Sequence, residues 1–509
     1  MTAKLPKDSM QSVISRVVPN VTVRDVQPVP SLRSQRLFDV QISDGSGLLL
    51  ALPPPLMVKL LRSEQGSVSS EAAVLNWLAG SGLDRPLLHN EAAPSSMEKT
   101  RTPRDKSPPT TGSLVYNSPN SPSRTLYPVL LAHSASSNEY GIEYNVLRST
   151  PGVLIADIKP PLNPAERKII DLRTGQFCRR LSKLVSPSGK FGPAFAVLPS
   201  LSSPSTPGTT ASQASRDANS RMNESRGVSS WSMAFHSMLE AVLRDGEDMA
   251  VMLGYAAVRR HFKQWEHALD NVTTPRLVAV DAGNELNTMI MRNEDLPKSY
   301  PGTRGQTPND INGGSYDPND PNDPNDPYDT DGTDDSDEPD GKDTPVKTTN
   351  SEGHTHPVDV TGMKDWSNFV FGDPLFAAVF SNDPSEDFLT GFHSATPDEF
   401  ENTDSSGTPE PSGSLVDDKD TVPVRLLLYG CYHTITQIVK EFYRPQRDSS
   451  RRELAARKRL THILGKLDEM TMEAQARSRN SSLPPPSLSP QPLRHRSPSE
   501  ESQDLTGKA

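Results

Sequence analysis

The stretch from Val360 to Ala377 reads VTGMKDWSNFVFGDPLFA and decides the interpretation of the whole chain. Its first residues have the apolar pattern of a buried strand, and an Asp365-Trp366 pair follows where that strand ends. An aromatic turn and a Gly-Asp-Pro step then lead into a second apolar segment. Carboxylates at the end of a strand often bind metal ions, so Asp365 is the first candidate for a functional residue.

The composition favours one globular core with polar insertions. The 509 residues would allow two or three domains by length, but the chain has 48 prolines, 33% hydrophobic residues, 6% aromatic residues and a mean hydropathy of -0.58. A chain with so few apolar residues cannot bury its whole length. We expect flexible or disordered segments at 1–30, 84–125, 199–229, 293–358, 382–422 and 476–509.

The net charge of -11 arises in one acidic segment. Between Asp317 and Asp343 there are eleven Asp, one Glu and one Lys, including an Asp-Pro-Asn repeat, and the rest of the chain is close to neutral. We therefore expect no nucleic-acid partner. The acidic segment is interpreted as a solvated linker, and the disordered insertions are candidate contacts for protein partners.

No sequence feature indicates secretion or a membrane. The first residues lack the apolar core of a signal peptide, and no run approaches 18 apolar residues. The two cysteines, Cys178 and Cys431, lie in amphipathic contexts and indicate buried thiols rather than a disulfide. We expect an intracellular, cytoplasmic protein without a membrane partner.

Periodic segments between the insertions predict both strands and helices. One helix start is especially clear, because Asn163 is a good cap, Pro164 suits the first helical position and Glu166 suits the third. A polar loop at 281–287 separates two short apolar strands. Strands are predicted at 38–42 and 48–52, joined as a hairpin by a turn at 44–47, and at 276–280 and 288–291. Order is also predicted at 126–131 and 142–147. Helices are predicted at 70–78, 163–184, 231–243, 247–269, 425–443 and 451–472.

The opening stretch resembles the x-x-G-x-x-D-[WF]-x-x-x-x-x-G-D-P box of the aminoglycoside phosphotransferase family. Residues 425–445 also resemble the ending of a fungal-type branch of that family. The resemblance implies a two-lobed, protein-kinase-like α+β fold, with a small lobe at 31–141 and a large helical lobe at 142–475. It also implies that Asp365 holds the Mg²⁺ of ATP and that Asp373 is structural.

The polar loop resembles the family's catalytic loop, L-V-H-G-D-x-x-x-x-N. The segment LVAVD places Asp281 at the catalytic aspartate, and Asn287 then corresponds to the metal-binding asparagine. The chain departs from the pattern in two ways. Ala279 and Val280 replace His and Gly, and the Asp-to-Asn spacing is six residues instead of five. The extra residue leaves Asn284 as an alternative metal ligand.

The parts implied for nucleotide binding are less complete. In kinases a lysine on the third strand pairs with a helix glutamate and holds the phosphates. Glu71 matches the glutamate, but Ala51 stands where the resemblance implies a lysine, and no glycine-rich loop precedes it. The resemblance further implies a hinge at 142–146 that contacts the nucleotide through Glu143, Tyr144 and Val146.

These observations leave two classes of function open. If the site is complete, the chain transfers the γ-phosphoryl group of Mg-ATP to a hydroxyl group of a small molecule, with Asp281 as the base. If the missing lysine and the altered loop prevent catalysis, the chain is a pseudokinase that binds a nucleotide or a partner. In a third interpretation it is a scaffold whose insertions make the contacts.

Overall fold

The computed structural model describes residues 7–31, 33–81, 126–134, 143–199, 227–292, 357–394 and 414–481. Within these ranges helices and sheets are mixed, which confirms the α+β prediction. The expected insertion at 84–125 and most of those at 199–229 and 293–358 lie outside the described residues, as does the chain beyond 481.

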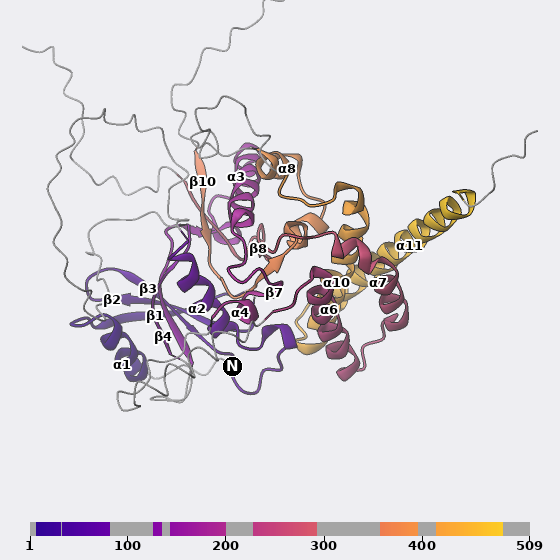
Figure 1. The fold of residues 1–509 in the computed structure, drawn as a ribbon. Helices are drawn as coiled ribbons and strands as arrows, with labels where there is room; N and C mark the ends of the chain where they lie inside the picture. The colour runs from indigo at the N-terminus through magenta and orange to yellow at the C-terminus, as the bar shows by residue number, and fades with distance from the viewer. Residues whose placement is uncertain are drawn as a thin grey trace, which may run out of the picture.

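A five-stranded antiparallel sheet forms the part of the molecule at the left of Figure 1. The strand order is β1-β2-β3-β5-β4. The predicted hairpin of β2 and β3 is confirmed, with Leu37 opposite Ala51 and Asp39 opposite Leu49. The strands are β1 (Val23–Val29), β2 (Arg36–Ile42), β3 (Gly47–Leu52), β4 (Val129–Ser134) and β5 (Tyr144–Arg148).

The two faces of this sheet are covered by different helices. Helix α1 (Lys7–Val17) packs Met10 and Ile14 against the outer face, whereas α2 (Ser67–Leu78) lies on the inner face. Residues 7–29, expected to be a flexible terminus, thus form a helix and an edge strand. Helix α1 has only a short apolar side. It packs on a sheet face that is formed by strands later in the chain.

The predicted helix start at Asn163 is confirmed. Helix α3 (Pro164–Lys183) begins with a reciprocal pair of hydrogen bonds, in which Asn163 Oδ1 accepts from the Glu166 N–H and Glu166 Oε2 accepts from the Asn163 N–H, each at 2.9 Å. Both bonds satisfy main-chain donors that the first turn of a helix leaves open. The helix ends at Lys183, one residue before the predicted end.

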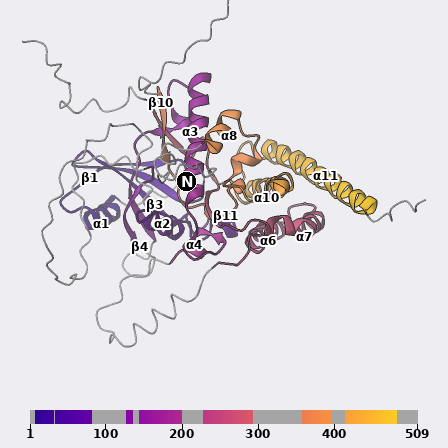
Figure 2. The ribbon, with the colours of Figure 1, turned by 45° about the horizontal axis from the view of Figure 1, so that its top comes forward.

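Helix α8 (Glu386–His393) lies inside the segment 382–422, which was expected to be disordered. It packs against α3 (Figure 2). Both helices carry a glycine at the contact. A Cβ on Gly175 or on Gly391 would come within 2.1 Å of main-chain atoms of the opposite helix. Residues 386–393 are therefore ordered by close backbone packing, which the polar composition of the segment does not reveal.

Four longer helices gather at the right of Figure 1 and stay together in Figure 2. The break between the first two is displaced from its predicted place at 247. The first helix continues to Asp248, and a turn with Ala250 at a φ of 50° precedes the next helix. The four are α6 (Trp231–Asp248), α7 (Tyr255–Asp270), α10 (Val422–Tyr443) and α11 (Ser449–Ser481).

Two three-stranded sheets near the centre of Figure 1 carry the polar loop, with strand orders β7-β11-β8 and β10-β9-β6. The chain leaves the first sheet in the turn at 149–152, so the expected hinge at 142–146 is largely part of strand β5. The strands are β6 (Val153–Leu154), β7 (Gly192–Pro193), β8 (Arg276–Ala279), β9 (Thr288–Arg292), β10 (Val358–Met363) and β11 (Phe369–Gly372).

One apolar core connects the inner face of the first sheet to the helices. It includes Leu49 and Ala51 of β3, Trp366 after β10, and Ile435 of α10. The short helix α4 (Ala194–Val197) also contributes to this core. Among the described helices, none combines the length and the apolar character that crossing a membrane requires.

Candidate functional site

Asp365 lies two residues beyond β10 and is buried, with 5% of its surface exposed. Its Oδ1 atom accepts hydrogen bonds from the Ser367 N–H at 2.8 Å and the Ser367 hydroxyl at 2.6 Å. Its Oδ2 atom is buried without a partner in the described part of the chain. Burial raises the pKa of this carboxyl group, although Ser367 and Arg33 act in the other direction. A cation at Oδ2 would remove the cost of this unpaired oxygen.

Asn287 is fixed beside Asp365 by two hydrogen bonds to its main chain. Asn287 Oδ1 accepts from the Asp365 N–H at 2.8 Å, and Asn287 Nδ2 donates to the Asp365 carbonyl at 3.3 Å. Asn284, the alternative ligand, is exposed, and its Oδ1 accepts from the Leu286 N–H. The N–H groups of Asn287 and Thr288 both donate to the Asn284 carbonyl. This tight turn accommodates the extra residue between Asp281 and Asn287, so Asn287 still lies beside Asp365.

Asp281 begins the polar loop, after the end of β8. Its Oδ2 atom accepts a hydrogen bond from Asn368 Nδ2 at 2.6 Å and lies 3.5 Å from Arg33 Nε. The side chain is 23% exposed, so it is more accessible than Asp365. The main chain of Val280 anchors the loop, because its carbonyl accepts from the Ala378 N–H at 2.9 Å.

Arg33 is a functional candidate that the sequence did not reveal. It lies in the connection between β1 and β2, far along the chain from both carboxylates that it faces. Burial opposes its charge, but Asp281, Asp365 and Glu64 outweigh that effect and raise the pKa of Arg33. The site therefore contains a cation near both the candidate base and the candidate metal ligand, although it does not come from β3.

Glu71 is fully buried on α2 and makes no ion pair with any described residue. It accepts hydrogen bonds from Asn145 Nδ2 at 3.0 Å and from the Trp366 N–H at 3.3 Å. Burial and the nearby charge of Asp365 raise the pKa of Glu71 to about 8. The side-chain amide of Asn145 thus takes the place of the lysine that the resemblance implies at position 51. With this pKa, Glu71 is mostly protonated at pH 7.

The side chains of two of the three predicted hinge residues point away from the site. Tyr144 and Val146 pack on the outer face of the sheet, in the core that α1 covers, so neither can reach a ligand beside Asp365. The residue between them, Asn145, faces the site because side chains alternate along a strand. Glu143, directly before the strand, accepts a hydrogen bond from the Ser69 hydroxyl of α2.

The available donors fit magnesium. The described residues contain no group of three or more His, Cys, Asp or Glu side chains that could hold a metal alone. Magnesium does not need such a group, because it is commonly bound by one or two carboxylates together with substrate phosphates. The unpartnered Oδ2 of Asp365 supplies the carboxylate oxygen, and the Asn287 carbonyl oxygen beside it retains one lone pair.

Asp373 is a buried carboxylate beneath the polar loop and accepts several hydrogen bonds. It accepts hydrogen bonds from Tyr429 at 2.7 Å, from the Leu375 N–H at 3.1 Å and from Arg425, which is itself fully buried. These bonds hold the segment at 374–381, which in turn bonds to the Val280 carbonyl. Asp373 therefore supports the position of Asp281 and takes no direct part in the site.

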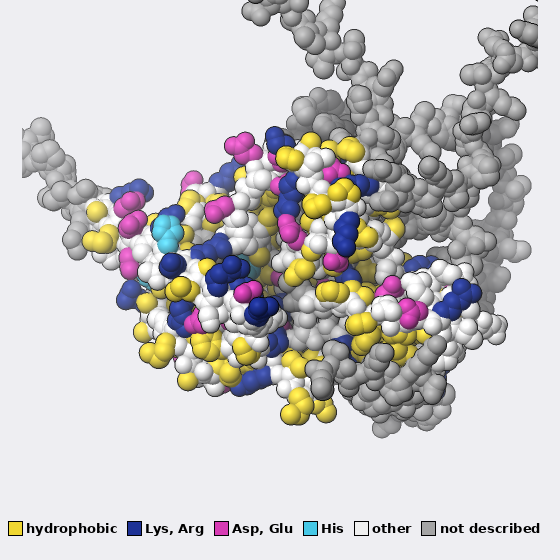
Figure 3. Space-filling view, turned by 180° about the vertical axis from the view of Figure 1, so that it is seen from behind, with side chains coloured by type: hydrophobic (Ala, Val, Ile, Leu, Met, Phe, Trp, Pro, Cys, Tyr) yellow, Lys and Arg dark blue, Asp and Glu magenta, His cyan; other side chains and the backbone are white. Residues whose placement is uncertain are grey.

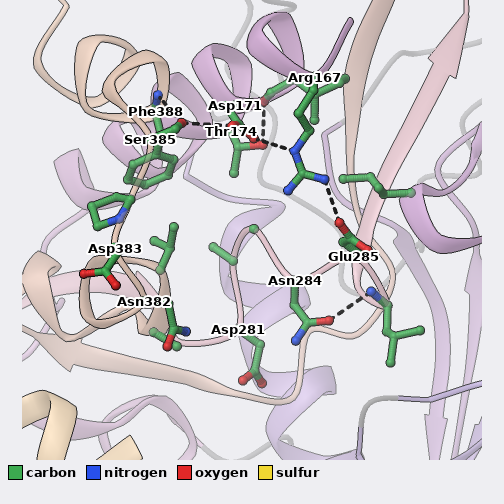
Figure 4. Close-up of a pocket in the computed structure, with 18 residues that line it drawn as sticks. Arg167, Asp171, Thr174, Asp281, Asn284, Glu285, Asn382, Asp383, Ser385 and Phe388 are labelled. Atoms are coloured by element: carbon green, nitrogen blue, oxygen red, sulfur yellow. Dashed lines mark hydrogen bonds and ion pairs between the residues drawn. The ribbon is translucent and has the colours of Figure 1, made fainter. Parts of the chain in front are cut away.

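Two cavities border Asp281. The α3 cavity, of about 590 Å³, lies between the polar loop, α3 and the start of α8, and is drawn in Figure 4. Arg167 is paired there with Asp171 at 3.1 Å and Glu285 at 2.6 Å. The α10 cavity, of about 630 Å³, lies between the β1–β2 connection and the helices α10 and α11.

The Asp281 carboxyl group faces the α10 cavity. In Figure 4 this group points away from Arg167 and Asp171. Both side chains that contact it, Arg33 and Asn368, line the α10 cavity and not the α3 cavity. A hydroxyl group that approaches Asp281 would therefore come from the α10 side.

No family model and no curated protein matches the sequence. Solved structures of aminoglycoside phosphotransferases do match. One, from Ralstonia eutropha and assigned to that class, has 10% identity and a TM-score of 0.40, over 91% of this chain and 98% of the other. APH(2″)-IIa in complex with gentamicin matches at 10% identity and a TM-score of 0.38, over 90% and 97%.

A third match is the GDP complex of aminoglycoside 2′-phosphotransferase-IIIa, with 10% identity, a TM-score of 0.38 and coverage of 91% of this chain and 99% of the other. These structures are described as aminoglycoside phosphotransferases, the family whose motifs the sequence resembles. Similarity at this level of identity and TM-score says nothing about activity, so the functional proposal has to rest on the geometry of the site.

Proposed function

We propose that the chain is a phosphotransferase that moves the γ-phosphoryl group of ATP to a hydroxyl group of a small molecule. The observation that carries this proposal is the convergence of Arg33, Asp281 and Asp365 from three distant segments, with one buried oxygen of Asp365 unpartnered. Phosphoryl transfer requires a base, a carboxylate for the metal and cations near the phosphates. These three residues are of the required types.

Each residue has one role in the proposed reaction. Asp365 would hold Mg²⁺ through Oδ2, and Asn287 fixes the main chain of Asp365. When bound there, magnesium would neutralise the negative charge of the phosphates. Arg33 supplies the positive charge that Ala51 cannot supply.

Asp281 acts as the base. Its two described contacts both fall on Oδ2, which leaves Oδ1 for the acceptor hydroxyl. Asp281 takes the hydroxyl proton while the acceptor oxygen bonds to the γ-phosphorus. The bond between that phosphorus and the bridging oxygen breaks at the same time, and ADP leaves.

A thermal-shift titration with ATP and Mg²⁺ tests the nucleotide site. Wild-type protein should gain about 2.7 kcal/mol of stability at a ligand concentration 100 times Kd. Asp365→Asn keeps the size of the side chain but removes its charge, so it should lose the Mg²⁺-dependent part of the shift. Asp281→Asn should keep the shift, because Asp281 acts on the acceptor. The absence of any shift at millimolar Mg-ATP would refute the proposal.

A second candidate function, a nucleotide-binding pseudokinase, is favoured by the pairing of Glu71 with Asn145 in place of a lysine. The two functions differ in turnover. A phosphotransferase without its acceptor still transfers phosphate slowly to water, and Asp281→Asn should reduce this ATP hydrolysis by about 10²-fold or more. A pseudokinase would show the Mg-ATP shift with no hydrolysis above the level of Asp281→Asn.

A further inference from the structure

Asp365 is closed off from both cavities that border Asp281. It is 5% exposed, its Oδ2 atom is buried, and it lines neither the α3 cavity nor the α10 cavity. A nucleotide that reached Asp281 through either cavity would therefore not yet touch Asp365. A part of the protein has to move before Asp365 can take part in binding.

Residues 33–35, directly before β2, form a cover between Asp365 and the α10 cavity. Arg33 and Ser34 line the α10 cavity, so one side of the cover faces open space. Gln35 lines neither cavity and is only 3% exposed, so it lies deeper in the protein. The cover thus extends from the wall of the cavity into the buried part of the site.

Both ends of the cover lie at carboxyl groups of the site. Arg33 Nε lies 3.5 Å from Asp281 Oδ2, and the Gln35 side chain lies beside Glu71. Asp365 interacts electrostatically with Arg33 at one end and with Glu71 at the other. The cover therefore runs past Asp365, and its displacement would open Asp365 to the α10 cavity.

Ser34 fastens the cover to the pair of Glu64 and Arg444. Its hydroxyl group donates to Glu64 Oε2 at 3.1 Å and accepts from Arg444 Nη1. These two partners come from the connection between β3 and α2 and from the end of α10. Because Ser34 lines the cavity, water can replace both hydrogen bonds when the cover moves, so the net cost of opening is small.

Arg33 cannot keep its present place when the site is loaded. It now lies near two carboxylates, Asp281 and Asp365, and a divalent cation bound to Asp365 would repel it. The phosphates of a nucleotide would attract the same guanidinium group. Figure 3 shows further Lys and Arg side chains on the surface beside α11, which also lines the α10 cavity, so this side of the molecule attracts anions. Arg33 can thus exchange carboxylates in the closed state for phosphates in the open state.

We propose that residues 33–35 are an autoinhibitory cover that blocks Asp365 in the resting protein, and that the contact of Ser34 with Glu64 and Arg444 sets the fraction of open molecules. This inference rests on the proposed function, because it takes Asp365 as the residue that the Mg²⁺ of the nucleotide must reach. Only open molecules accept the nucleotide, so the cover lowers the association rate and the apparent affinity by that fraction. A residue that contacts the bound nucleotide changes mainly the dissociation rate instead.

Stopped-flow binding of a fluorescent, non-hydrolysable ATP analogue with Mg²⁺ to the full chain measures both rates. Ser34→Ala loosens the cover and should raise the association rate constant roughly threefold to tenfold, the usual range for one hydrogen bond, with dissociation unchanged. Glu64→Gln weakens the same contact from the other side, should act in the same direction, and replaces Ser34→Ala if that variant fails to fold. Ser46→Ala is the matched control and should change neither rate. Ser46 also donates to a carboxylate, Asp44, but in the turn at the other end of β2.

Two results would overturn the cover. If Ser34→Ala and the wild-type protein bind the analogue at the same rate, Asp365 is reached without an opening step. If Ser34→Ala changes only the dissociation rate, the serine contacts the bound nucleotide. Both results leave the proposed function standing, because the nucleotide still binds. Failure of the wild-type protein and of both variants to bind the analogue would instead refute the proposed function, and the cover with it.

Discussion

The two cavities beside Asp281 share one loop but differ in charge and in the burial of their ion pairs. The α3 cavity contains four carboxylates and one cation, Arg167, whose side chain is 42% exposed. The α10 cavity contains five cations, and its pair of Glu64 and Arg444 is only 4% and 19% exposed. The same candidate base therefore lies between an acidic region and a basic one.

This difference has a structural origin. Asp281 and Asp365 follow strands of the central sheets. The positive charge of the α10 cavity comes instead from Lys440 and Arg444 of α10 and its end, and from Arg459 of α11. Residues outside the central sheets thus set the charge on one side of the candidate base.

The largest effect is expected from Arg33→Ala, which removes the cation of the α10 cavity that contacts Asp281. Loss of one preorganised cation from a transition state typically costs about 10²–10³ in rate, or about 2.7–4 kcal/mol. We expect ATP hydrolysis to fall by this factor. Arg36→Ala is the control, because Arg36 lies at the start of β2 and donates to the Pro53 carbonyl, away from Asp281. Equal rates for the two variants would show that Arg33 only pairs with Asp281 in the resting protein.

The next effect concerns the buried pair in the α10 cavity. Glu64→Gln leaves Arg444 without its carboxylate, and the loss of one partner of a buried pair costs about 3 kcal/mol of unfolding free energy. Urea denaturation at pH 7 measures this. A variant as stable as the wild type would contradict this contribution of the buried pair.

The sequence predicted the parts of the site that depend on local order. The strands around 281–287 and the box at 360–377 place Asp281, Asn287 and Asp365 at strand ends, where the structure brings them together. Local patterns also gave the hairpin of β2 and β3 and the capped start of α3. Strand alternation and capping are properties of a few neighbouring residues, so one sequence is sufficient to read them.

The missed features depend on contacts between distant segments. Arg33 faces Asp281 only because the β1–β2 connection folds over the polar loop. The directions of Tyr144 and Asn145 depend on which face α1 covers, and α1 was not predicted. Helix α8 forms because two glycines let it approach α3. No local pattern contains this information.

A smaller effect, on pH dependence, concerns Glu71, which lines neither cavity. Its pKa in the native state is about 8, above the usual 4.5, because it is buried near Asp365. Between these values the native protein holds a proton that the unfolded chain releases, so the unfolding free energy falls as pH rises. We expect Glu71→Gln to remove on the order of 2 kcal/mol of this decline between pH 5 and 8. Urea unfolding at each pH measures it, and parallel curves for the two proteins would contradict the protonated state of Glu71.

The smallest effect is expected on the α3 side, and it is the control for the whole comparison. Glu285→Gln breaks the pair with Arg167, in which both side chains are largely exposed. Exposed pairs contribute roughly 0–1 kcal/mol because water and salt screen them. Stability should therefore change by less than about 1 kcal/mol, and ATP hydrolysis should stay the same, since Glu285 does not line the α10 cavity that Asp281 faces. If Glu285→Gln lowers ATP hydrolysis as much as Arg33→Ala does, the α3 side takes part in the reaction. The comparison of the two cavities would then be wrong.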